Sequence, residues 1–177
     1  MEKSRIISIQ VPDSEVGFSV DSTILGPSDL LRVMLEDPEC KEIFLSISQV
    51  SFAFILEYLQ HQSSGAPPPA TLRRPLKRPL IHSSMSADKI EELMRQSLLD
   101  AGVTEWEYKF LTKLTSREGE GEEEAAGIGR PLKNVLSASN YLAIIPLVHL
   151  LSAWIAVEIM KSNPDKISKI IDSIIQD

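Results

Sequence analysis

The chain has 177 residues and a formal net charge of −7, with 25 acidic side chains against 18 lysines and arginines. This balance argues against nucleic acid as the main partner, because phosphate binding needs clustered lysine and arginine. The hydrophobic content of 43% is enough for a real core in one domain or a domain and a half. The single cysteine, Cys40, excludes an internal disulfide, so we expect a reducing compartment.

The beginning of the chain predicts a small sheet. Residues 5–11 and 16–20 are short and rich in isoleucine, valine or phenylalanine, which is typical of strands. Pro12 and Asp13 predict the turn of a hairpin between them. Residues 43–47 are brief and apolar and predict a third strand.

Capping residues predict the helices of this half. Asp21 and Ser22 can cap a short helical turn, and Ser28, preceded by proline and followed by aspartate, predicts the start of a firmer helix. Ser48 can cap a longer helix, whose apolar residues follow i, i+3, i+4, i+7 spacing at Phe52, Ile55, Leu56 and Leu59. Residues 1–62 therefore predict an α+β unit.

Two stretches of biased composition divide the rest of the chain. Residues 63–85 hold five of the eleven prolines and four basic side chains without an acid, which predicts an extended linker or a solvated loop. Residues 117–129 hold five glutamates and four glycines and predict a disordered loop. Between them, residues 86–101 predict a helix with Gly102 as its C-terminal stop, and Trp106 and Phe110 follow without a predicted element.

Residues 132–160 form the longest apolar segment. A membrane span needs about 20 apolar residues, so the length of this segment makes a membrane span one alternative. Pro146, His149 and Ser152 interrupt the run, and Pro146 fits the first turn of a new helix. The segment therefore predicts two helices joined at a tight corner near residues 144–146, and no membrane span.

The second of these helices carries two apolar stripes where a surface helix needs only one. The first stripe contains Leu147, Leu150, Leu151 and Trp154, and the second contains Val148, Ser152, Ile155 and Ile159. A central core helix explains this pattern, and so does a helix that turns one stripe toward a protein partner. Residues 165–175 predict a further amphipathic helix with five isoleucines on one face, which would fold back on the domain or line a groove.

The sequence contains no recognisable catalytic pattern. His61, His82 and His149 are far apart, and none has ligand-like spacing to Cys40 or to another histidine. Phosphate-binding loops and the common hydrolase motifs are absent. We therefore expect a protein that is not an enzyme and that uses no cofactor and no metal.

Six segments, in the right order, resemble the Skp family, the S-phase kinase-associated adaptors of SCF ubiquitin ligases. SASNYLAIIPLVHLLSAWIAVEI at 137–159 is similar to the signature helices of that family, in which Ala-Ala-Asn-Tyr-Leu precedes a leucine-rich helix. EWEYKFLTKL at 105–114 resembles the family's Trp-Asp-x-x-Phe segment, and KSNPDKISKII at 161–171 resembles its Gly-Lys-Thr-Pro-Glu-Glu-Ile-Arg stretch. The front half of the family is matched by IISIQVPDSEVGFSVD, MLED and LEYLQHQ.

The resemblance implies an α+β fold, a BTB/POZ-like domain with additional C-terminal helices. Residues 1–62 would form its first half, 63–85 a linker, 86–160 the remainder with the acidic loop 117–129, and 161–177 an extension of the partner groove. It also implies an adaptor of the ubiquitin conjugation pathway, in the cytoplasm and nucleus, that acts only through protein–protein interaction.

The adaptor would join an F-box-type protein to a cullin. Asn140 and Tyr141 would face the cullin. The F-box groove would be lined by residues from the two signature helices and the last amphipathic segment: Leu132, Val135, Leu136, Val148, Ser152, Ile155, Ile159, Ile167, Ile170 and Ile171.

Departures from the family leave alternatives open. Residues 70–102 are longer and more basic than the family's acidic loop and add a helix, residues 118–124 insert glutamate and glycine, and Lys133 replaces a common phenylalanine. A divergent structural subunit of another complex, for example at the kinetochore, would bind an F-box-like partner without a cullin. A homodimer of the isolated chain would bury the same apolar surface against itself.

Overall fold

The computed structural model describes residues 4–65, 84–116 and 130–161, together with residues 72, 76, 79 and 81. These residues contain seven helices and one three-stranded sheet, so the predicted α+β class is confirmed. The chain forms two compact units, the first from residues 1–69 and 134–148 and the second from residues 70–133 and 149–177. Helices α6 (Arg130–Tyr141) and α7 (Ile145–Lys161) contribute residues to both units.

The sheet of the first unit has the strand order β2-β1-β3. Strand β1 (Ile6–Gln10) pairs antiparallel with β2 (Phe18–Asp21), which confirms the predicted hairpin. Strand β3 (Glu42–Phe44) is shorter than predicted and lies parallel to β1 on its other side. The parallel pairing brings together segments more than thirty residues apart, so it depends on the helices between them.

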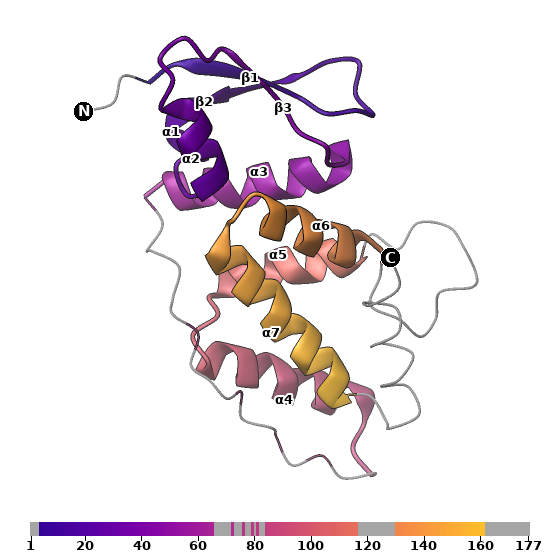
Figure 1. Cartoon of the computed structure of the whole chain (residues 1–177). Coiled ribbons are helices and arrows are strands. Elements are labelled where there is room, and N and C mark those ends of the chain that lie inside the picture. Colours follow the sequence, from indigo (N-terminus) through magenta and orange to yellow (C-terminus); the bar gives the residue numbers. More distant parts are fainter. Residues whose placement is uncertain are drawn as a thin grey trace. The chain divides into compact units, whose positions relative to one another are not determined.

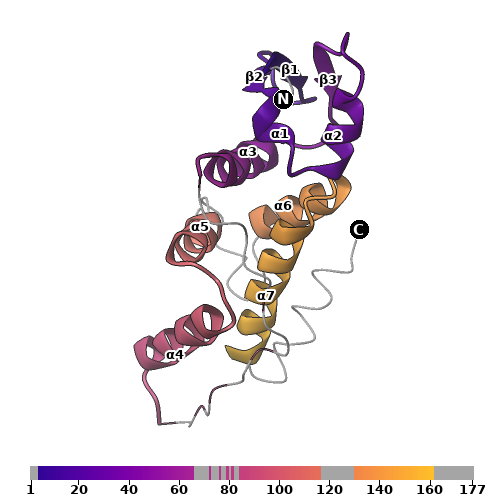
Figure 2. The same cartoon turned by 90° about the vertical axis from the view of Figure 1, so that its left-hand side faces the viewer.

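One face of this sheet is covered by α1 (Ser22–Leu25), α2 (Asp29–Leu35) and α3 (Gln49–Ser63), as Figures 1 and 2 show. The side chains that point to these helices are buried, among them Ile7, Ile9 and Ile43. Phe18 meets Phe52 of α3 edge to face, with ring centroids 4.9 Å apart. The sheet is therefore the outer layer of the first unit, with one buried face.

The predicted caps begin the predicted helices. The side chains of Asp21, Ser28 and Ser48 accept hydrogen bonds from the first-turn amides of α1, α2 and α3, at 2.9, 3.2 and 3.2 Å. Hydrogen bonds from the Ser4 hydroxyl and then from Thr23 hold the pKa of the Asp21 carboxyl below its ordinary value. Each cap satisfies an amide that the helix itself leaves without a partner.

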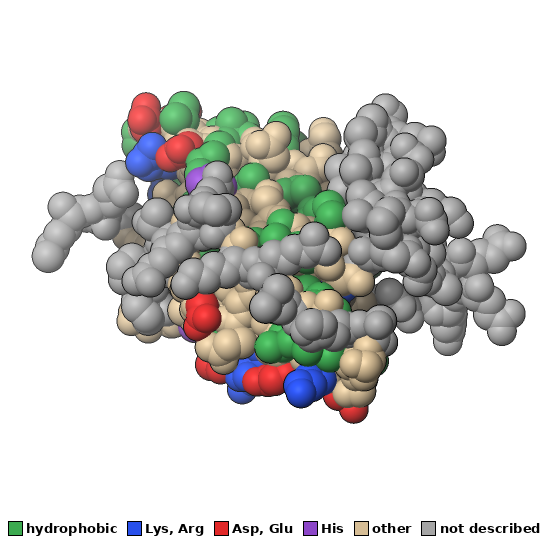
Figure 3. All heavy atoms as spheres, turned by 90° about the horizontal axis from the view of Figure 1, so that it is seen from below, with side chains coloured by type: hydrophobic (Ala, Val, Ile, Leu, Met, Phe, Trp, Pro, Cys, Tyr) green, Lys and Arg blue, Asp and Glu red, His purple; other side chains and the backbone are tan. Residues whose placement is uncertain are grey.

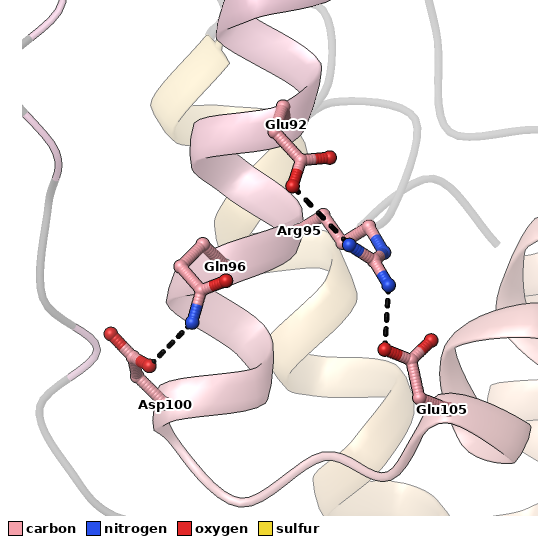
Figure 4. Close-up of polar contacts among 5 residues, drawn as sticks. All are labelled: Glu92, Arg95, Gln96, Asp100 and Glu105. Carbon is pink, nitrogen blue, oxygen red and sulfur yellow. Dashed lines mark hydrogen bonds and ion pairs between the residues drawn. The ribbon is translucent and has the colours of Figure 1, made fainter.

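Two helices, α4 (Ala87–Asp100) and α5 (Glu105–Ser116), belong wholly to the second unit. The end of α4 before Gly102 confirms the predicted stop. Helix α5 was not predicted, although its start carries a capping box: the Thr104 amide donates to Glu107 at 2.8 Å, and the Glu107 amide donates to the Thr104 hydroxyl at 3.2 Å. Figure 4 shows Arg95 of α4 between Glu92 and Glu105, which ties α4 to the start of α5.

Several predictions fall on other parts of the chain. Most of the linker at 63–85, the acidic loop at 117–129 and the last amphipathic helix at 165–175 lie outside the described residues. Among the helices that the structure does describe, none is long and apolar enough to cross a membrane.

Candidate functional site

Helices α6 and α7 meet at the corner predicted near residues 144–146. The Ile144 amide donates to the Ser139 carbonyl at 2.9 Å, and the Ala143 amide donates to the Asn140 carbonyl at 3.0 Å. These two bonds form a Schellman motif, which requires a left-handed residue, and Ala143 has a φ of 53°. Pro146 lies in the first turn of α7, where its missing amide costs no helical hydrogen bond.

The corner exposes the two residues that the resemblance assigns to the cullin. Asn140 is exposed, and Tyr141 keeps 49% of its surface accessible. Ile145, which the sequence reasoning did not select, is 46% exposed at the start of α7. An accessible amide, a phenol and an aliphatic side chain so close together in the chain suit a protein partner better than a small polar ligand.

The two stripes of α7 differ in their exposure. Every member of the first stripe is buried, from Leu147 through Leu150 and Leu151 to Trp154. In the second stripe Ser152 is exposed, Val148 and Ile159 are half-buried, and only Ile155 is buried. The first stripe thus belongs to the core of the chain, while the second offers surface along the same helix.

The predicted groove residues fall into three groups. Leu132, Val135 and Ile155 are buried, so a partner reaches them only if their neighbours move. Leu136, Val148, Ser152 and Ile159 keep accessible surface. Ile167, Ile170 and Ile171 lie outside the described residues.

A row of aromatic and basic side chains links three helices of the second unit. The Arg95 guanidinium lies 5.5 Å from the ring centroid of Tyr108. The ring centroids of Tyr108 and Trp154 are 5.8 Å apart. The ammonium group of Lys161 lies 5.6 Å from the Trp154 ring and 2.8 Å from the Glu158 carboxylate. Burial, and after it the charge of Glu91, raises the pKa of the Tyr108 hydroxyl. These contacts hold α4, α5 and α7 together, and the sequence reasoning did not foresee them.

The described residues contain no group of three histidine, cysteine, aspartate or glutamate side chains placed to hold a metal ion. On the face drawn in Figure 3, hydrophobic side chains reach the surface in several places, and acidic and basic side chains lie along the lower edge and at the upper left.

No family model matches the sequence of the chain, and no curated protein matches it.

Proposed function

We propose that this chain is a non-enzymatic adaptor of the Skp type, which binds an F-box-type helical motif and links it to a cullin in an SCF-type ubiquitin ligase. The fold of the first unit would be BTB/POZ-like, and α6 and α7 would be the additional C-terminal helices. The ordered sequence segments that resemble the Skp family suggested this function.

The order of elements is compatible with the proposal. A β-hairpin, two short helices, a third strand and a longer helix follow one another in the first unit. The segment 105–114, which resembles the Trp-Asp-x-x-Phe stretch, lies within α5. The segment 137–159, which resembles the signature helices, contains the end of α6, the corner and most of α7.

The unequal burial of the two stripes of α7 is the observation that carries the proposal. A helix buried on all sides would bury Ser152 as well as Leu151, but Ser152 is exposed. Helical partners commonly lay an apolar face along such a stripe, with anchors at i, i+3, i+4 and i+7. On the second stripe, Val148, Ser152 and Ile159 keep accessible surface, which supports a partner of this kind, while Ile155 is buried.

The F-box side is tested by placing a charge on the accessible stripe. Ser152→Arg is expected to weaken binding to a recombinant F-box domain at least tenfold, because a desolvated and unpaired guanidinium would lie in the interface. Ser152 is exposed, so the variant keeps its fold. Thr112→Arg, at an exposed position of α5, is the matched control, and isothermal titration gives the dissociation constants. Equal affinities for all three proteins would place the partner elsewhere.

The cullin side is tested at the corner. Tyr141→Ala is expected to weaken binding to a recombinant cullin at least tenfold and to leave F-box binding unchanged, because tyrosine is among the residues that dominate interface energies. Val50→Ala on α3 is the control, since Val50 is exposed to a similar extent, at 54%. A chain that binds the F-box domain but no cullin would be a fixed subunit of another complex. Self-association that rises with concentration and blocks the F-box domain would indicate the homodimer.

A further inference from the structure

The hydroxyl of Ser28 joins α2 to the corner between α6 and α7. Ser28 is fully buried, and its Oγ donates a hydrogen bond of 2.6 Å to the carbonyl oxygen of Leu142, which is 114 residues away in the chain. The same oxygen accepts the 3.2 Å hydrogen bond from the Leu31 amide that caps α2. Figure 2 shows the corner next to α2. Both residues belong to the first unit.

The Leu142 carbonyl needs this donor. Leu142 directly follows the last residue of α6, and carbonyl groups at the end of a helix have no hydrogen-bond donor within that helix. Because Leu142 is also buried, water does not replace the missing donor. Its peptide group also leads directly into Ala143, the residue with a φ of 53°. The hydrogen bond from Ser28 therefore fixes the orientation of the peptide that precedes the left-handed residue.

We infer that Ser28 is a positioning residue for the partner surface at the corner. By holding the Leu142 peptide it sets the path of the backbone from Tyr141 through Ala143 to Ile145, and so the placement of Tyr141 relative to Ile145 within the first unit. This inference rests on the proposed function only for the identity of the partner. The positioning itself follows from the contacts of Ser28.

The first part of the test is hydrogen exchange of single amides. Ser28→Ala is expected to accelerate exchange of the Ala143 and Ile144 amides about tenfold relative to the amides of α3, because the corner loses a buried hydrogen bond. Ser48→Ala is the matched control, since Ser48 caps α3 through an amide at the same 3.2 Å distance and its hydroxyl donates only locally, to Ser51. If Ser28→Ala accelerated amide exchange equally throughout the first unit, Ser28 would act only as the cap of α2, and the inference would be overturned.

The second part measures binding to a recombinant cullin and to a recombinant F-box domain. Ser28→Ala is expected to weaken cullin binding about tenfold with F-box binding unchanged, and Ser48→Ala to change neither. If Ser28→Ala lost affinity equally for the cullin and the F-box domain, or if Ser48→Ala lost as much cullin affinity as Ser28→Ala, the inference that Ser28 positions the corner would be contradicted. If Ser28→Ala does not fold, Ser28→Gly replaces it, because glycine as a helix cap costs only a few tenths of a kcal/mol. A wild-type chain that binds no cullin refutes the proposed function, while the exchange rates still decide the role of Ser28.

Discussion

Replacement of Trp154 by alanine is expected to lower the free energy of unfolding by about 4 kcal/mol, the middle of the range for a buried large aromatic side chain. Trp154 is 6% exposed and contacts both Tyr108 and Lys161. Its indole N–H is buried and has no hydrogen-bond acceptor among the described residues, so packing rather than hydrogen bonding determines the loss. Urea unfolding followed by circular dichroism measures it, and the melting temperature should fall by roughly 10 °C.

Two variants isolate the contribution of packing at Trp154. Trp154→Phe keeps most of the ring and has no N–H to leave unsatisfied, so it should cost less than half as much as the alanine variant. Trp106→Ala removes the same side chain from a half-buried position of α5 and should cost less than Trp154→Ala. If the phenylalanine variant were as unstable as the alanine variant, a polar contact of the indole would be responsible instead.

The described part of the chain contains two Schellman corners with different residues in the left-handed position, and opposite substitutions should have opposite effects on stability. Gly102 has a φ of 108°, and the amides of Gly102 and Val103 donate to Leu99 and Leu98 at 2.9 and 3.0 Å. Gly102→Ala should lower the free energy of unfolding by about 1–2 kcal/mol, because a Cβ atom is disfavoured at positive φ. Ala143→Gly should raise it by about 1 kcal/mol, because it removes that Cβ atom from the other corner.

An alanine in a helix interior supplies the control for this pair. Ala53 is exposed on α3, so Ala53→Gly makes the same chemical change as Ala143→Gly without relieving strain. It should lower the free energy of unfolding by about 1 kcal/mol through helix propensity alone. Chemical denaturation of the three variants gives the change in the free energy of unfolding for each, and the signs of these changes can be compared directly. A destabilising Ala143→Gly would show that the corner tolerates alanine at no cost.

Local signals in the sequence predicted most of the first unit. Ser28 and Ser48 each begin the helix that they predict, because capping involves only the amides two or three residues ahead. Gly102 ends α4 for an equally local reason. Helix α5 carried a local signal as well, the Thr104–Glu107 capping box, and attention to this spacing would have predicted its start.

Other features depend on contacts that no local pattern encodes. The parallel pairing of β1 with β3 and the hydrogen bond from Ser28 to Leu142 join segments that are distant in the chain. Ala143 gives no sign of a left-handed conformation, since alanine rarely adopts it. The apolar spacing of α7 predicted two stripes, but it could not decide that Leu151 is buried and Ser152 exposed, because that depends on which neighbours surround the helix.

The first unit consists of two separate stretches of the chain, and this has a consequence for synthesis in the cell. After residue 69 has been made, about 80 more residues must be translated before the stretch 134–148 is complete. At typical rates of about 5–20 residues per second, this delay lasts roughly 4–16 s. During that time the sheet and α1–α3 lack the segment that completes their unit, and Ser28 lacks Leu142. The nascent chain therefore presents unsatisfied apolar surface for seconds, which makes it a natural client for chaperones that act at the ribosome.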